Sequence, residues 1–353
     1  MVQKQEQEDA TDEIAEVAPG ILRLQLPIEF TGLGHVNCYA LEDERGFALV
    51  DPGMPGPTSW QNLMGRLALA EIPLARVHTV VVTHSHPDHF GAAALLAQET
   101  GAEIVAHERF RTLFDLNDID DSELEDADPD ADPELLAFLH RLDTPRPSPW
   151  GGEALGPPPE RLAEMRDNAA AVLPWMRSPR PTKRVGDLER IRLGGREWVG
   201  LDTPGHTDDH LCLFDEENGV LLSGDQVLPT ITPHISGMVD DALQRFMDSL
   251  DRLAGIGRVS VALPAHGHPM TDLAGRVKEI QTHHDSRLED LHRYSDELGW
   301  ASVTDLSHKL FKPRSWGGMA EDETYAHLEH LRLHGGAEVR EEAGVLLYKL
   351  ATG

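Results

Sequence analysis

The feature that most constrains this chain is the segment Thr83-His-Ser-His-Pro-Asp-His89, which places three histidines and an aspartate within six residues. It directly follows Thr79–Val82, a run of β-branched residues typical of a fully buried strand. Imidazole nitrogens and carboxylate oxygens are common zinc ligands. One histidine at such a place indicates only a core or surface residue, but four potential ligands at the end of one strand predict a metal site.

Three later positions repeat the pattern. His206, Asp225 and His266 each follow a predicted strand, and each lies beside or near a glycine, which lets the backbone pass close to a metal. Loops that follow strands line one edge of a sheet and can converge there. Five histidines and two aspartates would hold two metals with positions left for water and substrate. These expected ligands are His84, His86, Asp88, His89, His206, Asp225 and His266.

The rest of the chain predicts an α/β fold with an insertion. Strand and helix patterns alternate up to about residue 106 and resume at about residue 184. Between them, residues 115–134 hold 11 acids and no bases, and residues 145–159 hold six prolines. We interpret residues 107–183 as a helical insertion with acidic and proline-rich loops, including predicted helices at 134–142 and 161–176. The aspartate-rich run 126–132 lacks the glycine and closing glutamate of an EF-hand, so a solvated loop is favoured over a calcium site.

The two ends of the chain differ from its centre. Residues 1–18 are acidic and polar, which predicts a disordered tail before a domain over 19–270. Residues 271–353 predict a long helix, a short helix with Thr304 as its N-cap, a third helix and a hairpin. This order is typical of a winged-helix-like domain. The third helix begins with acids and holds one arginine, which predicts a structural role, packing against the catalytic domain or a second subunit.

The charge, hydropathy and cysteine content of the chain limit the partners that it is expected to bind. The net charge is −30, from 61 acids against 31 bases, and the chain has no run of lysines or arginines, so nucleic acid is not the expected partner. No apolar run could span a bilayer and the N-terminus carries no secretory h-region. Cys38 and Cys212 predict buried thiols and no disulfide framework. We expect a cytoplasmic enzyme with a small-molecule substrate, no membrane contact and a possible homodimer.

The motif His84-x-His86-x-Asp88-His89, followed in order by His206, Asp225 and His266, resembles the metallo-β-lactamase superfamily over roughly residues 20–106 and 184–270. The resemblance implies an αββα metallo-β-lactamase sandwich with the metals at one edge of paired sheets. It also implies that His84, His86 and His206 hold one zinc, that Asp88, His89 and His266 hold a second, and that Asp225 bridges them. Asp51 matches an acid that steadies a ligand.

Two ligand positions differ from those of other branches of the superfamily, and these differences limit the reactions to be expected. Asp225 stands where some lactamases have a cysteine and His86 stands where diiron flavoproteins have a glutamate, so the chain is more similar to glyoxalase II, lactonases and RNase Z. A water acidified between two Zn²⁺ ions (iron or manganese possible) would attack as hydroxide, with Asp88 as the catalytic residue that orients it. The leading hypothesis is hydrolysis of a thioester or ester, of acyl-CoA or acyl-glutathione type.

Other functions stay open at this point. A phosphodiesterase or ribonuclease is the alternative, although only scattered bases such as Arg180, Lys183 and Arg184 suggest a basic groove. A non-enzymatic regulator and an iron-dependent oxygenase are further candidates, and the complete ligand set argues against the first. Packing is favoured for the two tryptophans of the insertion, and His268, two residues from His266, is expected to point away from the site. The five further candidates, for contact with the site or for ordinary packing, are His210, His234, His268, Trp150 and Trp175.

Overall fold

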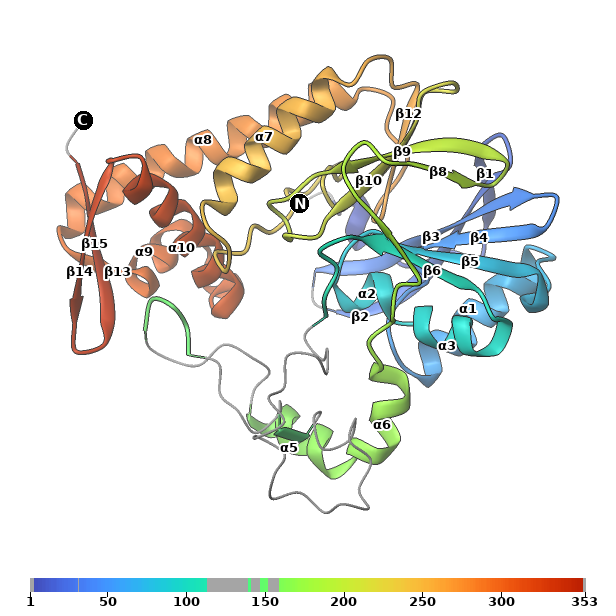
Figure 1. Cartoon of the computed structure of the whole chain (residues 1–353). Helices are drawn as coiled ribbons and strands as arrows, with labels where there is room; N and C mark the ends of the chain where they lie inside the picture. The colour runs from blue at the N-terminus through green and yellow to red at the C-terminus, as the bar shows by residue number, and fades with distance from the viewer. Residues whose placement is uncertain (1–2, 31, 113–138, 141–146, 152–158, 352–353) are drawn as a thin grey trace.

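A computed structural model describes residues 3–30, 32–112, 139–140, 147–151 and 159–351. Two β-sheets face each other and carry helices on their outer sides (Figure 1). Helices α1 (Pro57–Leu69) and α3 (Ala93–Thr100) cover the first sheet, whereas α7 (Ala242–Gly255) and the first half of α8 (Leu273–Leu298) cover the second. The predicted αββα sandwich is confirmed.

The first sheet has seven strands in the order β1-β2-β3-β4-β5-β6-β7. Strands β1 to β4 pair antiparallel, and β4, β5, β6 and β7 then pair in parallel. Because β4 and β5 run in the same direction, the loops that follow them leave the same edge of the sheet. The strands are β1 (Ile14–Ala18), β2 (Ile21–Phe30), β3 (Leu33–Asp43), β4 (Gly46–Val50), β5 (Val77–Val82), β6 (Glu103–His107) and β7 (Lys183–Val185).

The second sheet has five strands in the order β12-β11-β10-β9-β8. β11 and β12 pair in parallel, and β9 runs in their direction because β10 is antiparallel to both β9 and β11. Strands β9, β11 and β12 therefore end at one edge of this sheet. The strands are β8 (Arg190–Leu193), β9 (Arg196–Asp202), β10 (Leu211–Asp215), β11 (Val220–Gly224) and β12 (Val261–Pro264).

The interior between the two sheets is apolar. Alternate residues of both sheets meet there, including Leu41, Val81, Trp198 and Leu213, all fully or nearly fully buried. This packing is what a sheet does when one face is covered by another sheet. The two outer faces bury further clusters against the helices, and Cys38 and Cys212 lie in those clusters as buried free thiols, as the sequence predicts.

The prediction that residues 1–18 form a disordered tail is wrong for residues 3–18. Gln5–Gln7 form a 3₁₀ turn, and β1 pairs with β2 at the edge of the first sheet. The Glu6 carboxylate is buried and accepts hydrogen bonds from the backbone N–H groups of Thr230 and Ile231. Contacts with a segment more than 200 residues away order this stretch, and local composition cannot reveal such contacts.

The predicted insertion leaves the first sheet after β6 and returns at β7. Within it, α5 (Pro159–Asp167) and α6 (Ala169–Met176) replace the single helix predicted for 161–176, and the break falls at Asn168. The predicted helix at 134–142 lies mostly outside the described residues, and the aspartate run 126–132 lies wholly outside them.

After α8 come β13 (Ala301–Ser302), α9 (Val303–Leu310), α10 (Gly318–Leu333), β14 (Ala337–Glu342) and β15 (Val345–Leu350). The short strand β13 adds to the hairpin, giving a small sheet in the order β13-β15-β14. The N-cap of α9 is Ser302, not Thr304, because Ser302 and Asp305 form a reciprocal capping box. The resemblance of these elements to a winged helix stays a prediction.

Helix α8 joins this C-terminal module to the sandwich. Its first turns pack on the second sheet through residues such as Val277, whereas Leu291 belongs to the apolar cluster of the module. Among the helices that the structure describes, none combines the length and the apolar character needed to cross a membrane.

Candidate metal centre

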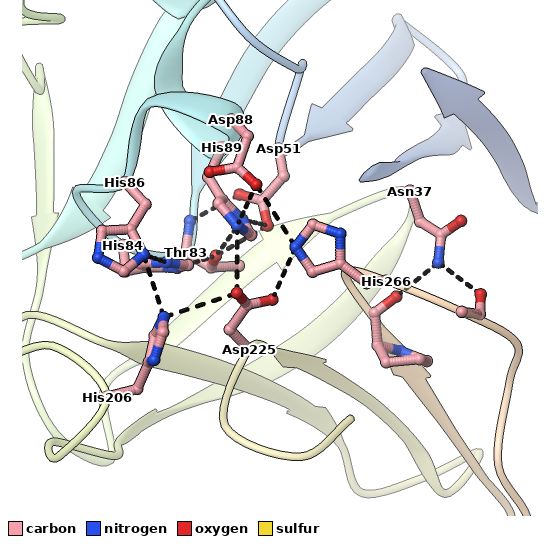
Figure 2. Close-up of polar contacts among 12 residues, drawn as sticks. Asn37, Asp51, Thr83, His84, His86, Asp88, His89, His206, Asp225 and His266 are labelled. Carbon is pink, nitrogen blue, oxygen red and sulfur yellow. Dashed lines mark hydrogen bonds and ion pairs between the residues drawn. The ribbon is translucent and has the colours of Figure 1, made fainter. Parts of the chain in front are cut away.

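All seven predicted ligands lie together where the two sheets end (Figure 2). The loop after β5 and the short helix α2 (Pro87–Phe90) bring His84, His86, Asp88 and His89. The other three come from the loops after β9, β11 and β12, which the strand directions place at the same edge. The ligands therefore converge because parallel-running strands end together, although up to 182 residues separate them along the sequence.

The first group of ligand atoms comes from His84, His86, His206 and Asp225. Nδ1 of His86 lies 3.0 Å from His84 Nε2 and 3.1 Å from His206 Nε2, and His206 Nε2 lies 3.5 Å from Asp225 Oδ2. Ligands of a tetrahedral zinc with bonds of about 2.0–2.1 Å lie about 3.3 Å apart. The spacing of this group fits a single such ion.

The second group comes from Asp88, His89 and His266. His89 Nε2 and His266 Nε2 lie 3.6 and 3.4 Å from Asp88 Oδ2. Asp225 also reaches this group, because its Oδ1 lies 3.3 Å from His266 Nε2. One carboxylate therefore lies between both groups, where the resemblance implies a bridging ligand.

Three polar atoms of this centre test whether a metal fits. Nε2 of His89, Nε2 of His266 and Oδ1 of Asp225 are buried and have no hydrogen-bond partner among the described residues. Leaving such atoms unsatisfied costs about 1–3 kcal/mol each. They belong to imidazole and carboxylate groups that point toward one another, so a divalent cation would satisfy all three, and the donor set suits zinc.

The second ring nitrogen of most ligand histidines has its own partner. Nδ1 of His206 lies 2.7 Å from the His234 carbonyl, Nδ1 of His266 lies 2.6 Å from the His35 carbonyl, and Nδ1 of His89 lies 2.9 Å from Asp51 Oδ2. An N–H donated to each of these oxygens places the proton on Nδ1 and leaves the Nε2 lone pair facing the centre. Such partners orient metal ligands and raise their basicity.

Asp51 connects two of the ligand segments. Its carboxylate accepts hydrogen bonds from the backbone N–H and the hydroxyl of Thr83, each at 2.8 Å, in addition to the bond from His89. It follows β4 directly and has a φ of 55°, in the left-handed region that aspartate tolerates. The contact with His89 agrees with the expected role of Asp51 in steadying a ligand.

Burial and neighbouring charges shift the pKa values of the histidines and of Asp225 in different directions. Desolvation and the nearby His89 lower the pKa of His84, and desolvation with His206 lowers that of His86, so both rings are neutral at neutral pH. Burial alone would lower the pKa of His89, but Asp88, Asp51 and Asp225 outweigh it and raise the pKa. Burial alone would raise the pKa of Asp225, but His266 and His89 hold it well below its usual range.

The other candidate histidines lie around the ligands and not among them. His210 is buried, and its Nε2 accepts the backbone N–H of Asp225, which fixes the loop of that ligand. His234 presents its carbonyl to His206 but turns its ring toward Asp322 of α10. His268 points away, as expected, and its ring contacts Glu8 and Arg23.

Sequence reasoning missed three polar residues of β3 that hold the His266 loop. The ring of His35 accepts from Gly267 N, the amide of Asn37 donates to the carbonyls of Pro264 and Gly267, and the Tyr39 hydroxyl donates to Pro264. They occupy alternate positions of one strand and share a face. A buried strand with three alternating polar residues is the signal that could have revealed them.

The two tryptophans of the insertion have different surroundings. Trp150 is buried against the C-terminal module, where its Nε1 donates to Glu321, so it does not roof the metal centre. Trp175 lines an apolar hollow formed with α1 and α3. Arg184, a candidate for a basic groove, instead donates to the carbonyls of Glu108 and Phe110.

The comparison with known families agrees with this geometry. The family model described as the metallo-beta-lactamase superfamily matches residues 31–269, about two thirds of the chain. The chain belongs to the metallo-β-lactamase superfamily. Members of this superfamily typically bind divalent metals, and the clustered histidines and aspartates of the centre agree with that property.

The individual relatives differ from this chain at most aligned positions. A metallo-beta-lactamase family protein from Thermus thermophilus is 28% identical, with a TM-score of 0.73 over 95% of this chain and 100% of its own. The lactamase-like protein adaB of Aspergillus niger is 28% identical over 55% of this chain and 58% of its own length. The atrochrysone carboxyl ACP thioesterase of Aspergillus fumigatus is 30% identical over 40% of this chain and 32% of its own. The chain thus spans less than two thirds of these fungal relatives.

Proposed function

We propose that this protein is a binuclear zinc hydrolase that cleaves a thioester or ester of a small acyl compound. The observation that carries the proposal is the position of Asp225, whose two oxygens lie within 3.6 Å of imidazole nitrogens from both ligand groups. A carboxylate shared in this way suits two metals held close together, the arrangement used for hydrolysis by paired metals.

When bound, the zinc pair would lower the pKa of a coordinated water toward 7 and polarise the scissile carbonyl. The chain's own residues would position the reactants. Asp88 is mostly buried, with Oδ2 3.4 Å from His266 Nε2, and its second oxygen would accept a proton from the attacking water. Asp88 is thus the catalytic candidate as well as a ligand.

Two features support an acyl substrate. The net charge of −30 disfavours polyanionic substrates such as RNA. The printed name of the A. fumigatus relative, a thioesterase, supports the same class.

The test is metal content followed by turnover on the same purified protein. Thioesters, lactones, β-lactams and bis-p-nitrophenyl phosphate form the substrate panel. His84→Ala, Asp225→Ala and His266→Ala remove ligands. His268→Ala is the matched control, because His268 lies two residues from a ligand but its ring contacts Glu8 and Arg23.

We expect the ligand variants to lose zinc and to lose at least about 100-fold in kcat/KM on the best thioester, while His268→Ala keeps both. Loss of a metal ligand removes the chemistry that gives most of the rate. A preference for the phosphodiester would favour the alternative, a phosphodiesterase or ribonuclease using the same residues. Turnover that is indifferent to His84→Ala and Asp225→Ala would reject a metal-dependent hydrolase.

A further inference from the structure

A second set of metal-ligating side chains lies away from the metal centre. Asp241 precedes α7, and His330 and His334 lie one turn apart at the end of α10. Nδ1 of His330 is 2.9 Å from Asp241 Oδ1, and Nε2 of His334 is 2.8 Å from Asp241 Oδ2. Ligand atoms of these three residues all lie within 4.8 Å of one another, as do those within each group of the metal centre.

The chemistry of these three residues suits a transition-metal ion. Two histidines spaced i, i+4 on one helix face present their rings side by side, and the two ring centroids are 4.4 Å apart. A carboxylate completes a three-ligand set, and zinc sites often combine such a set with a water. The His334 side chain is 51% exposed, so solvent can supply that water.

Only a small rearrangement separates the observed contacts from coordination. Ligands around a tetrahedral zinc lie about 3.3 Å apart, so each imidazole would move back by a few tenths of an ångström. Each ring would carry its proton on the other nitrogen and turn a lone pair toward the ion. Because His334 faces solvent, its ring has room for this movement and the ion can approach from outside.

Backbone geometry and charge favour a cation at this point. Asp241 has φ 45° and ψ 52°, the left-handed conformation that aspartate tolerates, and this holds it as the N-cap of α7 beside the end of α10. The two histidines lie at the carboxyl end of α10, the negative end of the helix dipole. The pKa of Asp241 is lowered, because the hydrogen bonds from the two histidines outweigh its partial burial, so its carboxylate is charged at neutral pH.

We propose that Asp241, His330 and His334 form a third divalent-metal site, of the zinc type, that ties the start of α7 to the end of α10. Asp241 also caps α7 through Gln244 N, so an ion here connects the helix on the second sheet to the C-terminal module. The site lies outside the metal centre and shares no ligand with it. Its role is to fasten the module to the sandwich.

The test counts zinc ions per chain. Metal-free protein is equilibrated with buffered Zn²⁺, and bound zinc is measured by elemental analysis. His334→Ala removes an exposed ligand, and Asp241→Asn keeps an oxygen for the α7 cap while removing the charge. His308→Ala is the matched control, because His308 is an exposed histidine of the same module that stacks on Trp316.

We expect His334→Ala and Asp241→Asn each to bind one zinc fewer than the wild type, and His308→Ala to bind the same number. The comparison is a difference of one, so it holds whatever number the metal centre itself retains. Equal zinc content in the wild type, His334→Ala and Asp241→Asn would overturn the third site.

Discussion

Asp51 contacts the back of one predicted ligand and is not itself a predicted ligand. It accepts from Thr83 and from Nδ1 of His89, so it fixes the ring whose Nε2 points inward. In Asp51→Asn, an amide NH₂ would replace one acceptor oxygen and lose a hydrogen bond. We expect zinc affinity to fall about 10–100-fold, the usual effect of removing a ligand's partner. Titration with Zn²⁺ against a chromophoric chelator measures this loss.

Asp43→Asn is the matched control for that substitution. Asp43 ends β3 and contacts His78 and the turn at Arg45, away from the ligands. Its zinc affinity should equal that of the wild type. If Asp51→Asn also binds zinc with unchanged affinity, the contact with His89 does not steady the ligand.

A buried histidine pair between α8 and α10 should make stability depend on pH. His327 Nδ1 donates to the Glu323 carbonyl, and its Nε2 lies 3.0 Å from His284 Nδ1, so a second proton on this ring would face another buried imidazole. Burial lowers the pKa of His327 to about 4. The unfolded chain takes up this proton as the pH falls below about 6.5, whereas the folded chain does so only near pH 4.

The free energy of unfolding should therefore decrease as the pH is lowered across this window. The decrease from His327 alone should be about 2 kcal/mol between about pH 7 and pH 5. The contribution is fully present above about pH 6.5. Urea unfolding of metal-free protein at the two pH values measures it, with His327→Asn compared with His308→Asn. We expect the first substitution to reduce the pH dependence and the second to leave it intact. Equal pH dependence in both would show that His327 titrates normally.

At the scale of elements, α10 reaches the metal centre through one loop. Asp322 of α10 accepts from the His234 ring and from Gly237 N, and the carbonyl of His234 accepts from the ligand His206. The C-terminal module therefore helps to place a ligand that the sandwich supplies. Asp322→Ala should loosen this loop and weaken zinc binding about tenfold, near the lower end of effects at ligand partners.

Glu321→Gln is the matched control for Asp322→Ala, because the preceding residue of α10 contacts Trp150 and not the loop. It should bind zinc as the wild type does. Zinc content under limiting metal and the KM of the best substrate are the readouts, since a merely destabilised module would change the unfolding midpoint alone. Equal zinc binding by both variants would contradict the proposed link.

Strands and helices whose pattern is local were predictable, and elements fixed by distant contacts were not. The buried run Thr79–Val82 and the apolar runs that form β10 and β11 follow from the hydrophobic pattern of the sequence. Strand β1 does not, because its order depends on pairing with β2 and on the buried Glu6 beside Thr230. The cap of α9 lies at Ser302 and not at the predicted Thr304, since both residue types suit an N-cap and only the capping box distinguishes them.

At the scale of the whole molecule, the convergence of the candidate ligands was predictable because they follow strands that end at one edge. The pattern places His84, His206, Asp225 and His266 in loops, and parallel directions bring those loops together. The cluster at Asp241 offers no such signal. Asp241 and His334 are 93 residues apart, at the start of one helix and the end of another, and only the packing of α10 against α7 makes them neighbours.

The charge of the whole molecule decides whether the C-terminal module can dock on nucleic acid. With a net charge of −30 and Glu321, Asp322 and Glu323 in the first turns of α10, approach to phosphates is repulsive. We expect no saturable binding of duplex DNA or single-stranded RNA by the full chain at about 150 mM salt, and none at about 50 mM, where attraction would be strongest. Fluorescence anisotropy with labelled oligonucleotides at the two salt concentrations measures this.

Binding that tightens steeply as salt is lowered would reveal a local basic surface and would favour phosphodiester chemistry at the metal centre. Absence of binding, together with thioester turnover, would mean that the module acts through its contacts with α7 and the His206 loop.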